Sequence, residues 1–166
     1  PQNVPTPTQE GQGFLISPGR GSLDFNDAGT KIIFTAMNNA GTFLLDFDKH
    51  TGIISNPIEI RVPHVTHPPP ATMMYQGYGS EFSPDGTKAY FCAIATAHGT
   101  PSIWQYDIAS ESMNVVPGSQ GRDYAEIITG NDGKLYVGKK TIPAELTIGV
   151  IENPNNPVTS VDFDPD

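Results

Sequence analysis

One unit recurs three times along this chain, and its turns constrain the fold more than any other feature of the sequence. Each copy has a short apolar strand, a turn with an Asp or Asn beside a glycine, a Lys close behind and a second strand. The copies are LDFNDAGTKIIFTAM from Leu23, SEFSPDGTKAYFCAI from Ser80 and AEIITGNDGKLYVGK from Ala125. Glycine in such a turn adopts the left-handed conformation that lets a hairpin close. The repeat therefore predicts three β-hairpins of one design.

Two further strand-like segments follow each hairpin. The third segment ends in an acid, 19, 21 and 19 residues after the turn glycines Gly29, Gly86 and Gly133; these acids are Asp48, Asp107 and Glu152. The fourth segments are PIEIRV from Pro57, MNVVPG from Met113 and VTSVDF from Val158. The glycines are 57 and 47 residues apart, a spacing that suits a four-stranded blade with variable loops. We expect four-stranded antiparallel units at about 23–62, 80–119 and 125–163.

The second strand of each unit is apolar on both faces. In KAYFCAI, Phe91 points to one face, and Tyr90 and Cys92 point to the other. A two-sheet sandwich would leave one face of every strand in water, so radially stacked blades fit better. The sequence predicts an all-β, β-propeller fold over 23–166, with a long loop at 62–79 and an N-terminal extension or part of a preceding blade at 1–22. Three blades are too few to close a propeller, which indicates part of a larger ring.

Three residues of chemically useful types, Asp85, Cys92 and Trp104, are expected to have structural roles. Asp85 lies in Ser-Pro-Asp-Gly, where every position has a use in a tight turn, so we expect no catalytic role for it. Cys92 lies within a strand and is expected to be an inert buried thiol. Trp104 is expected to be a core or inter-blade aromatic residue, with a sugar-stacking platform as the alternative.

The central unit carries a family resemblance. FSPDGTKAYF resembles the WD40-like repeat of periplasmic and secreted β-propellers, in which an FSPDG-K sequence opens each blade. With IWQYDI, LLDFDKHTGIISNPI, DGKLYVGK and IGVIENPN, the chain from about 23 to 157 is similar to the propeller segment of large surface or secreted proteins of Bacteroidota, which commonly use type IX secretion. The resemblance implies export and a secreted or cell-surface location. It implies no catalytic residues, because the shared motifs are turns and strands.

Charge and composition exclude several partner classes. The chain has 9 Lys and Arg against 18 Asp and Glu, and its net charge of −9 repels nucleic acid and anionic lipid. No apolar run approaches the length of a membrane span, so direct membrane insertion is not expected. Enzyme signatures such as G-x-S-x-G and H-E-x-x-H are missing from the sequence. No catalytic, cofactor-binding or metal-binding residues are therefore assigned.

The loop at 62–79 is the main candidate binding segment. Its candidate partner-binding residues are His64, His67, Met73, Met74, Tyr75 and Tyr78. Methionine and aromatic side chains form adaptable contact surfaces, although packing over the end of the ring or a solvated Pro-rich connector explains the same composition. The His64-x-x-His67 pair lacks a third ligand, so it is weak as a metal site.

The C-terminal tail is a weaker candidate. Asp162, Asp164 and Asp166 alternate there, and clustered carboxylates suit calcium, although solvated acids at a strand end are the plainer interpretation.

These observations predict a non-catalytic module of an exported bacterial surface protein that acts in protein binding, adhesion or scaffolding. Its expected partners are a protein or other parts of the same large surface protein. The alternative is a propeller enzyme, such as a metal-dependent hydrolase or a lactonase, with its site built from loops at one face. A purely structural spacer is a third hypothesis.

Overall fold

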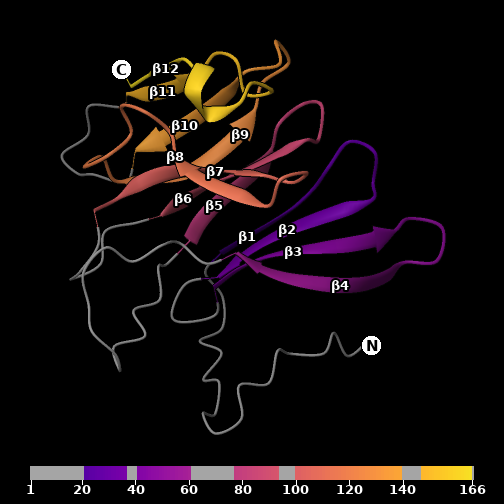
Figure 1. Ribbon diagram of the computed structural model, residues 1–166. Helices are drawn as coiled ribbons and strands as arrows, with labels where there is room; N and C mark the ends of the chain where they lie inside the picture. Colours follow the sequence, from indigo (N-terminus) through magenta and orange to yellow (C-terminus); the bar gives the residue numbers. More distant parts are fainter. Residues whose placement is uncertain (1–20, 37–40, 61–76, 94–99, 140–146, 166) are drawn as a thin grey trace, which may run out of the picture.

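The computed structural model describes residues 21–36, 41–60, 77–93, 100–139 and 147–165, and within these ranges the structure is all-β (Figure 1). The elements are β1 (Gly21–Phe25), β2 (Lys31–Ala36), β3 (Gly41–Asp48), β4 (Ile53–Ile60), β5 (Gly77–Phe82), β6 (Lys88–Ala93), β7 (Ser102–Asp107), β8 (Ser112–Val115), β9 (Tyr124–Thr129), β10 (Leu135–Lys139), β11 (Ile148–Ile151), the 3-10 helix η1 (Val158–Ser160) and β12 (Phe163–Asp164). Nothing helical in these ranges has the length and apolar character needed to cross a membrane.

The strands form three four-stranded antiparallel sheets, in each of which sequence neighbours pair. The first sheet is β1-β2-β3-β4, the second is β5-β6-β7-β8 and the third is β9-β10-β11-β12. Strand β5 contacts both β1 and β9, so the first strands of the three sheets lie side by side at one edge of the stack (Figure 1). Propeller blades are arranged in this way around their axis. The predicted fold, an all-β arrangement of three propeller blades, is confirmed. We call β1, β5 and β9 the inner strands.

The repeated turn has the same backbone geometry in all three sheets. Gly29, Gly86 and Gly133 have φ values of 64°, 69° and 78°, in the left-handed region that favours glycine. Each glycine N–H donates to the carbonyl three residues earlier, at 2.8, 2.8 and 3.0 Å. In the second sheet the Asp85 carboxylate accepts hydrogen bonds from the Ser83 hydroxyl and from the Thr87 N–H. The interpretation of Asp85 as a turn residue is therefore confirmed.

The second sheet is buried on both faces, as the apolar pattern predicts. Every residue of β6 is buried. Phe91 packs with Ile33 of the first sheet. Tyr90 and Cys92 point to the opposite face, where they pack with Val137 of the third sheet. The hydrophobic core therefore consists of two layers, one on each side of the second sheet.

The prediction for the fourth strand of the third sheet is partly wrong. VTSVDF was expected to be extended throughout, but its first three residues form η1, in which the Ser160 N–H donates to the Pro157 carbonyl at 2.9 Å. Pro157, at the N-cap of this helix, has a φ of −56°, which the proline ring favours and which suits the start of a helical turn. Only Phe163 and Asp164 remain in the sheet, paired with β11.

Acids near the end of the third strand have two structural roles, which one residue fills in the second sheet and two residues divide in the first. Asp107 forms an ion pair with Lys88 at 2.9 Å and also accepts the Ser110 N–H of the next turn. In the first sheet, Asp46 pairs with Lys31 at 2.7 Å, whereas Asp48 accepts the N–H of the following turn at His50. A β-bulge between Leu44 and Asp46 accompanies this division.

Gly86→Ala tests the dependence of the hairpins on the left-handed turn. We expect it to destabilise the protein by about 1–2 kcal/mol, because a Cβ is strained at positive φ. The atom nearest to the new Cβ would be an Asn26 side-chain atom at 3.4 Å. The expected loss of stability therefore comes from backbone strain and not from a steric clash. Urea unfolding measures the loss. The control is Gly138→Ala, whose Cβ would meet only Glu126 Cβ at 3.8 Å. An equal loss in both variants would contradict the prediction.

Candidate functional site

The inner strands carry two carboxyl groups at equivalent positions. Asp24 on β1 lies five residues before Gly29, and Glu81 on β5 lies five residues before Gly86. The two side chains are hydrogen-bonded to each other across the seam between the first and second sheets. The topology therefore brings together two acids that lie far apart in the sequence.

Each of these acids also binds the inner strand of the next sheet. The Phe82 N–H of the second sheet donates to Asp24 Oδ2 at 3.4 Å and to Oε1 of the adjacent Glu81 at 3.1 Å. The Thr129 N–H of the third sheet donates to Glu81 Oε2 at 2.9 Å. Phe82 and Thr129 both lie four residues before their turn glycines. The inner strand of each sheet is an edge strand with outward N–H groups, and in the second and third sheets a carboxyl group from the preceding sheet accepts one of them.

This environment raises the pKa of Glu81 to about 8. Burial contributes most and the hydrogen bond with Asp24 contributes next, whereas the Thr129 and Phe82 N–H groups act in the opposite direction. Burial and the neighbouring carboxyl group thus favour the protonated form of Glu81, which can donate a hydrogen bond to Asp24. The hydrogen bond between the two carboxyl groups thus joins the first sheet to the second.

A close approach of backbones accompanies the carboxyl pair. A Cβ on Gly79 would lie 2.6 Å from the Ala125 carbonyl oxygen and 2.8 Å from Glu126 Cα, so only glycine allows β5 to lie this close to β9. On the other side of β5, the Ser22 and Ser80 hydroxyls are 2.6 Å apart. The inner strands are therefore joined by direct polar and backbone contacts.

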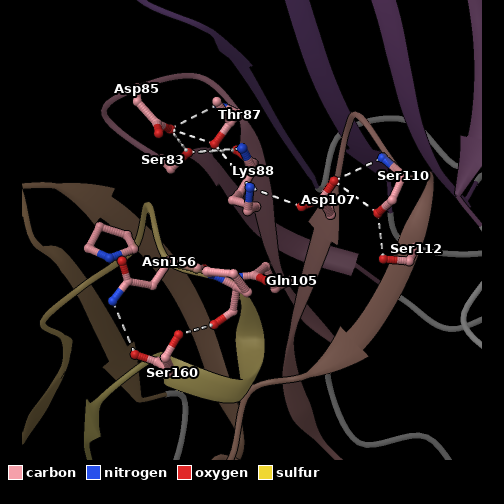
Figure 2. A network of polar contacts seen from close by, with 12 residues as sticks. Ser83, Asp85, Thr87, Lys88, Gln105, Asp107, Ser110, Ser112, Asn156 and Ser160 are labelled. Atoms are coloured by element: carbon pink, nitrogen blue, oxygen red, sulfur yellow. Dashed lines mark hydrogen bonds and ion pairs between the residues drawn. The ribbon is translucent and has the colours of Figure 1, made fainter.

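A second polar network lies at the end of the second sheet where β6 begins and β7 ends (Figure 2). The hydrogen bond from the Ser110 N–H and the Lys88 ammonium hold the pKa of Asp107 at about 2. Burial raises the pKa of Asp85, but hydrogen bonds from Thr87 and Ser83 outweigh that effect and the pKa is lowered. Both carboxylates are thus stabilised in their charged form by neighbouring groups, mostly of the turns.

Buried polar side chains join the second sheet to the third. The Tyr90 hydroxyl donates to the Pro154 carbonyl at 2.7 Å. Gln105 Nε2 donates to the Tyr90 hydroxyl at 2.6 Å. It also donates to the carbonyl of Asn156, at 2.9 Å; Gln105 and Asn156 are both labelled in Figure 2. Burial raises the pKa of Tyr90, so this phenol stays protonated and acts as a donor. These bonds tie the segment between β11 and η1 to the second sheet.

The predicted loop residues fall mostly outside the described part of the chain. His64, His67, Met73, Met74 and Tyr75 lie in the range 61–76, which is not described. Tyr78 lies on β5, where it is half-buried and its carbonyl accepts the Thr35 hydroxyl at 2.7 Å.

The other singled-out residues have structural positions. Cys92 is a buried free thiol whose pKa is raised by burial, which confirms the prediction. Trp104 packs against the layer between the first and second sheets, which confirms the inter-blade aromatic interpretation. Of the tail acids, Asp162 and Asp164 are described and Asp166 is not. In the described ranges, no group of three or more His, Cys, Asp and Glu residues is arranged to hold a metal ion.

Sequence reasoning missed the Asp24–Glu81 pair. Both residues share a position in the repeat, and that equivalence was readable from the aligned turns. Their contact was not readable, because it requires the first strands of neighbouring sheets to meet.

Comparison with known proteins shows a similar fold among solved structures but does not assign the chain to a family. No family model matches the chain, and no curated protein matches it by sequence. By structure it is similar to hydrazine synthase of Kuenenia stuttgartiensis, with a TM-score of 0.52 and 12% identity over 85% of this chain and 40% of that chain. A weaker likeness, at a TM-score of 0.43 and 17% identity, is to the β-propeller domain of the Trilobed protease from Pyrococcus furiosus, covering 80% of this chain and 39% of that chain. The chain thus spans about two fifths of the solved chains it matches. At this identity, the likeness to the first protein bears on the fold alone.

Glu81 makes stability fall as the pH rises. Its pKa is raised in the folded state, so between about 4.5 and 8 the folded protein binds more protons than the unfolded chain. The stabilisation is complete below this range and is lost as the pH passes 8. We expect Glu81→Gln, which mimics the protonated acid, to be more stable than the wild type at pH 9 by about 1 kcal/mol, allowing for partial solvent screening. At pH 5 the two should be nearly equal.

Urea unfolding at pH 5, 7 and 9 measures this difference. Asp132→Asn is the matched control, because the Tyr136 hydroxyl lowers the pKa of Asp132 and so keeps its titration below the tested range. A Glu81→Gln variant with the same pH profile as the wild type would refute the shared-proton interpretation.

Proposed function

We propose that this chain is a non-catalytic propeller-blade module of an exported bacterial surface protein, and that it binds or positions other proteins. The observation that carries the proposal is that the buried and half-buried polar side chains of the seams bond one sheet to the next. The inner carboxyl pair caps strand N–H groups, and the buried Tyr90 and Gln105 join two sheets. Such groups hold a framework together, which leaves recognition to the loops.

The best-placed loop is the one that connects the first sheet to the second. It starts after Ile60 on β4 and ends before Gly77 on β5. Ile60 pairs with Thr42, and a Cβ on Gly77 would lie 3.0 Å from the Thr42 hydroxyl. The two ends are therefore held next to each other at the seam between the sheets. The segment carries His64, His67, Met73, Met74 and Tyr75, a composition suited to contacts with a protein partner.

Export is supported by the likeness of FSPDGTKAYF and its neighbouring strands to the repeats of secreted Bacteroidota propellers. A surface location also agrees with the acidic balance of the chain, which disfavours nucleic acid as a partner.

Cross-linking on intact cells of the source organism tests both parts of this proposal. A membrane-impermeant cross-linker should modify the protein and join it to a protein partner. Replacing residues 62–76 with a Gly-Ser segment of equal length should lower the cross-linked fraction by about tenfold, because the contact side chains are removed. Residues 77–79 are kept, since they belong to β5.

The control variant replaces the exposed turn residues Lys49, His50 and Thr51 with Gly-Ser and should cross-link like the wild type. Thermal unfolding must show that both variants are folded. Failure to label the protein on intact cells would contradict the surface location. Equal cross-linking after replacement of 62–76 would contradict the role of the loop.

A hydrolase is the second candidate, and the raised pKa of Glu81 is the observation that favours it. A carboxyl group with a pKa of about 8 beside a second carboxyl group is a common general acid–base arrangement. If it is catalytic, the protein should hydrolyse members of a lactone and ester panel, and Glu81→Gln should reduce the rate by at least about a hundredfold. The absence of hydrolysis in the wild type, or equal rates in both proteins, would reject this candidate.

A further inference from the structure

The most exposed apolar side chains lie on the two end sheets. Leu23 and Phe25 of the first sheet are 53% and 44% exposed, and Ile128 and Ile148 of the third are 60% and 56% exposed. Two others, Ile53 and Ile58, lie on β4. In the described ranges, the second sheet has none of them. The exposed apolar surface is thus concentrated on the sheets that have a neighbour on only one side.

The strand register identifies an apolar face on the first sheet. Leu23 is opposite Phe34 and Phe25 is opposite Ile32, so these four side chains share a face. Ile33 lies on the other face and packs against the second sheet. We call the face turned away from the second sheet the outer face; it includes Leu23, Phe25, Phe34 and Phe43, together with Ile32 and Leu45, which are already buried.

Strand β1 presents a backbone N–H at the same position as the N–H groups of β5 and β9 that bond to an acid of the preceding sheet. The Asn26 N–H donates to the Lys31 carbonyl within the hairpin. Since N–H groups alternate along a strand, the Phe25 N–H points to the opposite edge of β1. Phe25 lies four residues before Gly29, the position that Phe82 and Thr129 hold in their sheets. In both of those cases the N–H donates to a carboxyl group of the preceding sheet, and the Phe82 N–H also donates to Glu81 Oε1 of its own strand at 3.1 Å.

We propose that the outer face of the first sheet is the docking surface for a further four-stranded blade. Its inner strand carries an Asp or Glu five residues before the turn glycine, and that carboxylate accepts the Phe25 N–H. The contact continues an interface that already occurs twice in this chain. The blade covers Leu23 and Phe25 as the second sheet covers Ile33. This assignment does not depend on the proposed binding role of the loop.

The required carboxylate excludes a second copy of the chain as the occupant. The copy would have to offer the outer face of its third sheet, where the equivalent residue is Ile128, five residues before Gly133. Asp24 and Glu81 are already engaged by their own neighbouring sheets. The range 1–20 contains one acid, Glu10, and the residue five positions after it is Leu15 and not glycine. The docking blade is therefore neither a second copy of this chain nor its residues 1–20.

Site-specific photo-cross-linking identifies the occupant. Phe25 is replaced by the photoreactive analogue p-benzoylphenylalanine in the protein as its source organism makes it, and the cross-linked peptides are sequenced by mass spectrometry. We expect a cross-link to a strand with an Asp or Glu five residues before a glycine. Adding Leu23→Asp should lower the yield by about tenfold, since it places a charge against an apolar surface.

Ile53→Asp is the matched control. Ile53 is 49% exposed and belongs to the same sheet, but it pairs with Asp48 and shares the face opposite to the outer face. It should leave the yield unchanged, and circular dichroism checks that both variants fold. Cross-links to 124–129 or 148–151 of a second copy would overturn the proposal. So would cross-links only to residues 1–20, cross-links to a strand without the acid, or no cross-link at all.

Discussion

Burial of the second sheet on both faces is the constraint on which the rest of this structure depends. Strand β6 is buried along its whole length, and alternate side chains of this strand enter two separate hydrophobic layers. Because successive residues of a strand point to opposite faces, one run of apolar residues can stabilise two seams at once. The first and third sheets each contribute one covered face. The stacking of blades therefore follows from the apolar pattern of a single strand.

Polar contacts determine how the stacked sheets are aligned. The inner carboxyl groups of Asp24 and Glu81 cap strand N–H groups across each seam, and Tyr90 and Gln105 form buried bonds at the other end of the second seam. Hydrophobic burial has little directional preference, whereas these bonds require particular atoms to meet. The same carboxyl pair connects stability to pH, since the closed seam raises the pKa of Glu81.

The sequence predicted the hairpins well because their cause is local. The three turn glycines take positive φ within a few residues of the strands they connect, and Asp85 satisfies its hydrogen bonds within its own turn. The fourth strand of the third sheet was predicted less well, because Pro157 starts a 3-10 turn that an apolar pattern does not reveal. Asp107 both pairs with a lysine and accepts a turn N–H, whereas in the first sheet Asp46 and Asp48 divide these two roles. Predicting that division required the strand register, which a β-bulge shifts.

By itself, then, the sequence determined the repeat, the turns, the two-faced strands and the acidic surface, all of which depend on residues close together in the chain. Only the tertiary structure showed that Asp24 and Glu81 meet and that Glu81 bonds to Thr129, across 57 and 48 positions of sequence. The physical reason is that burial and a carboxyl neighbour change a pKa only when folding brings the groups together. The outer face of the first sheet was likewise apparent only once the partner of each strand face was known.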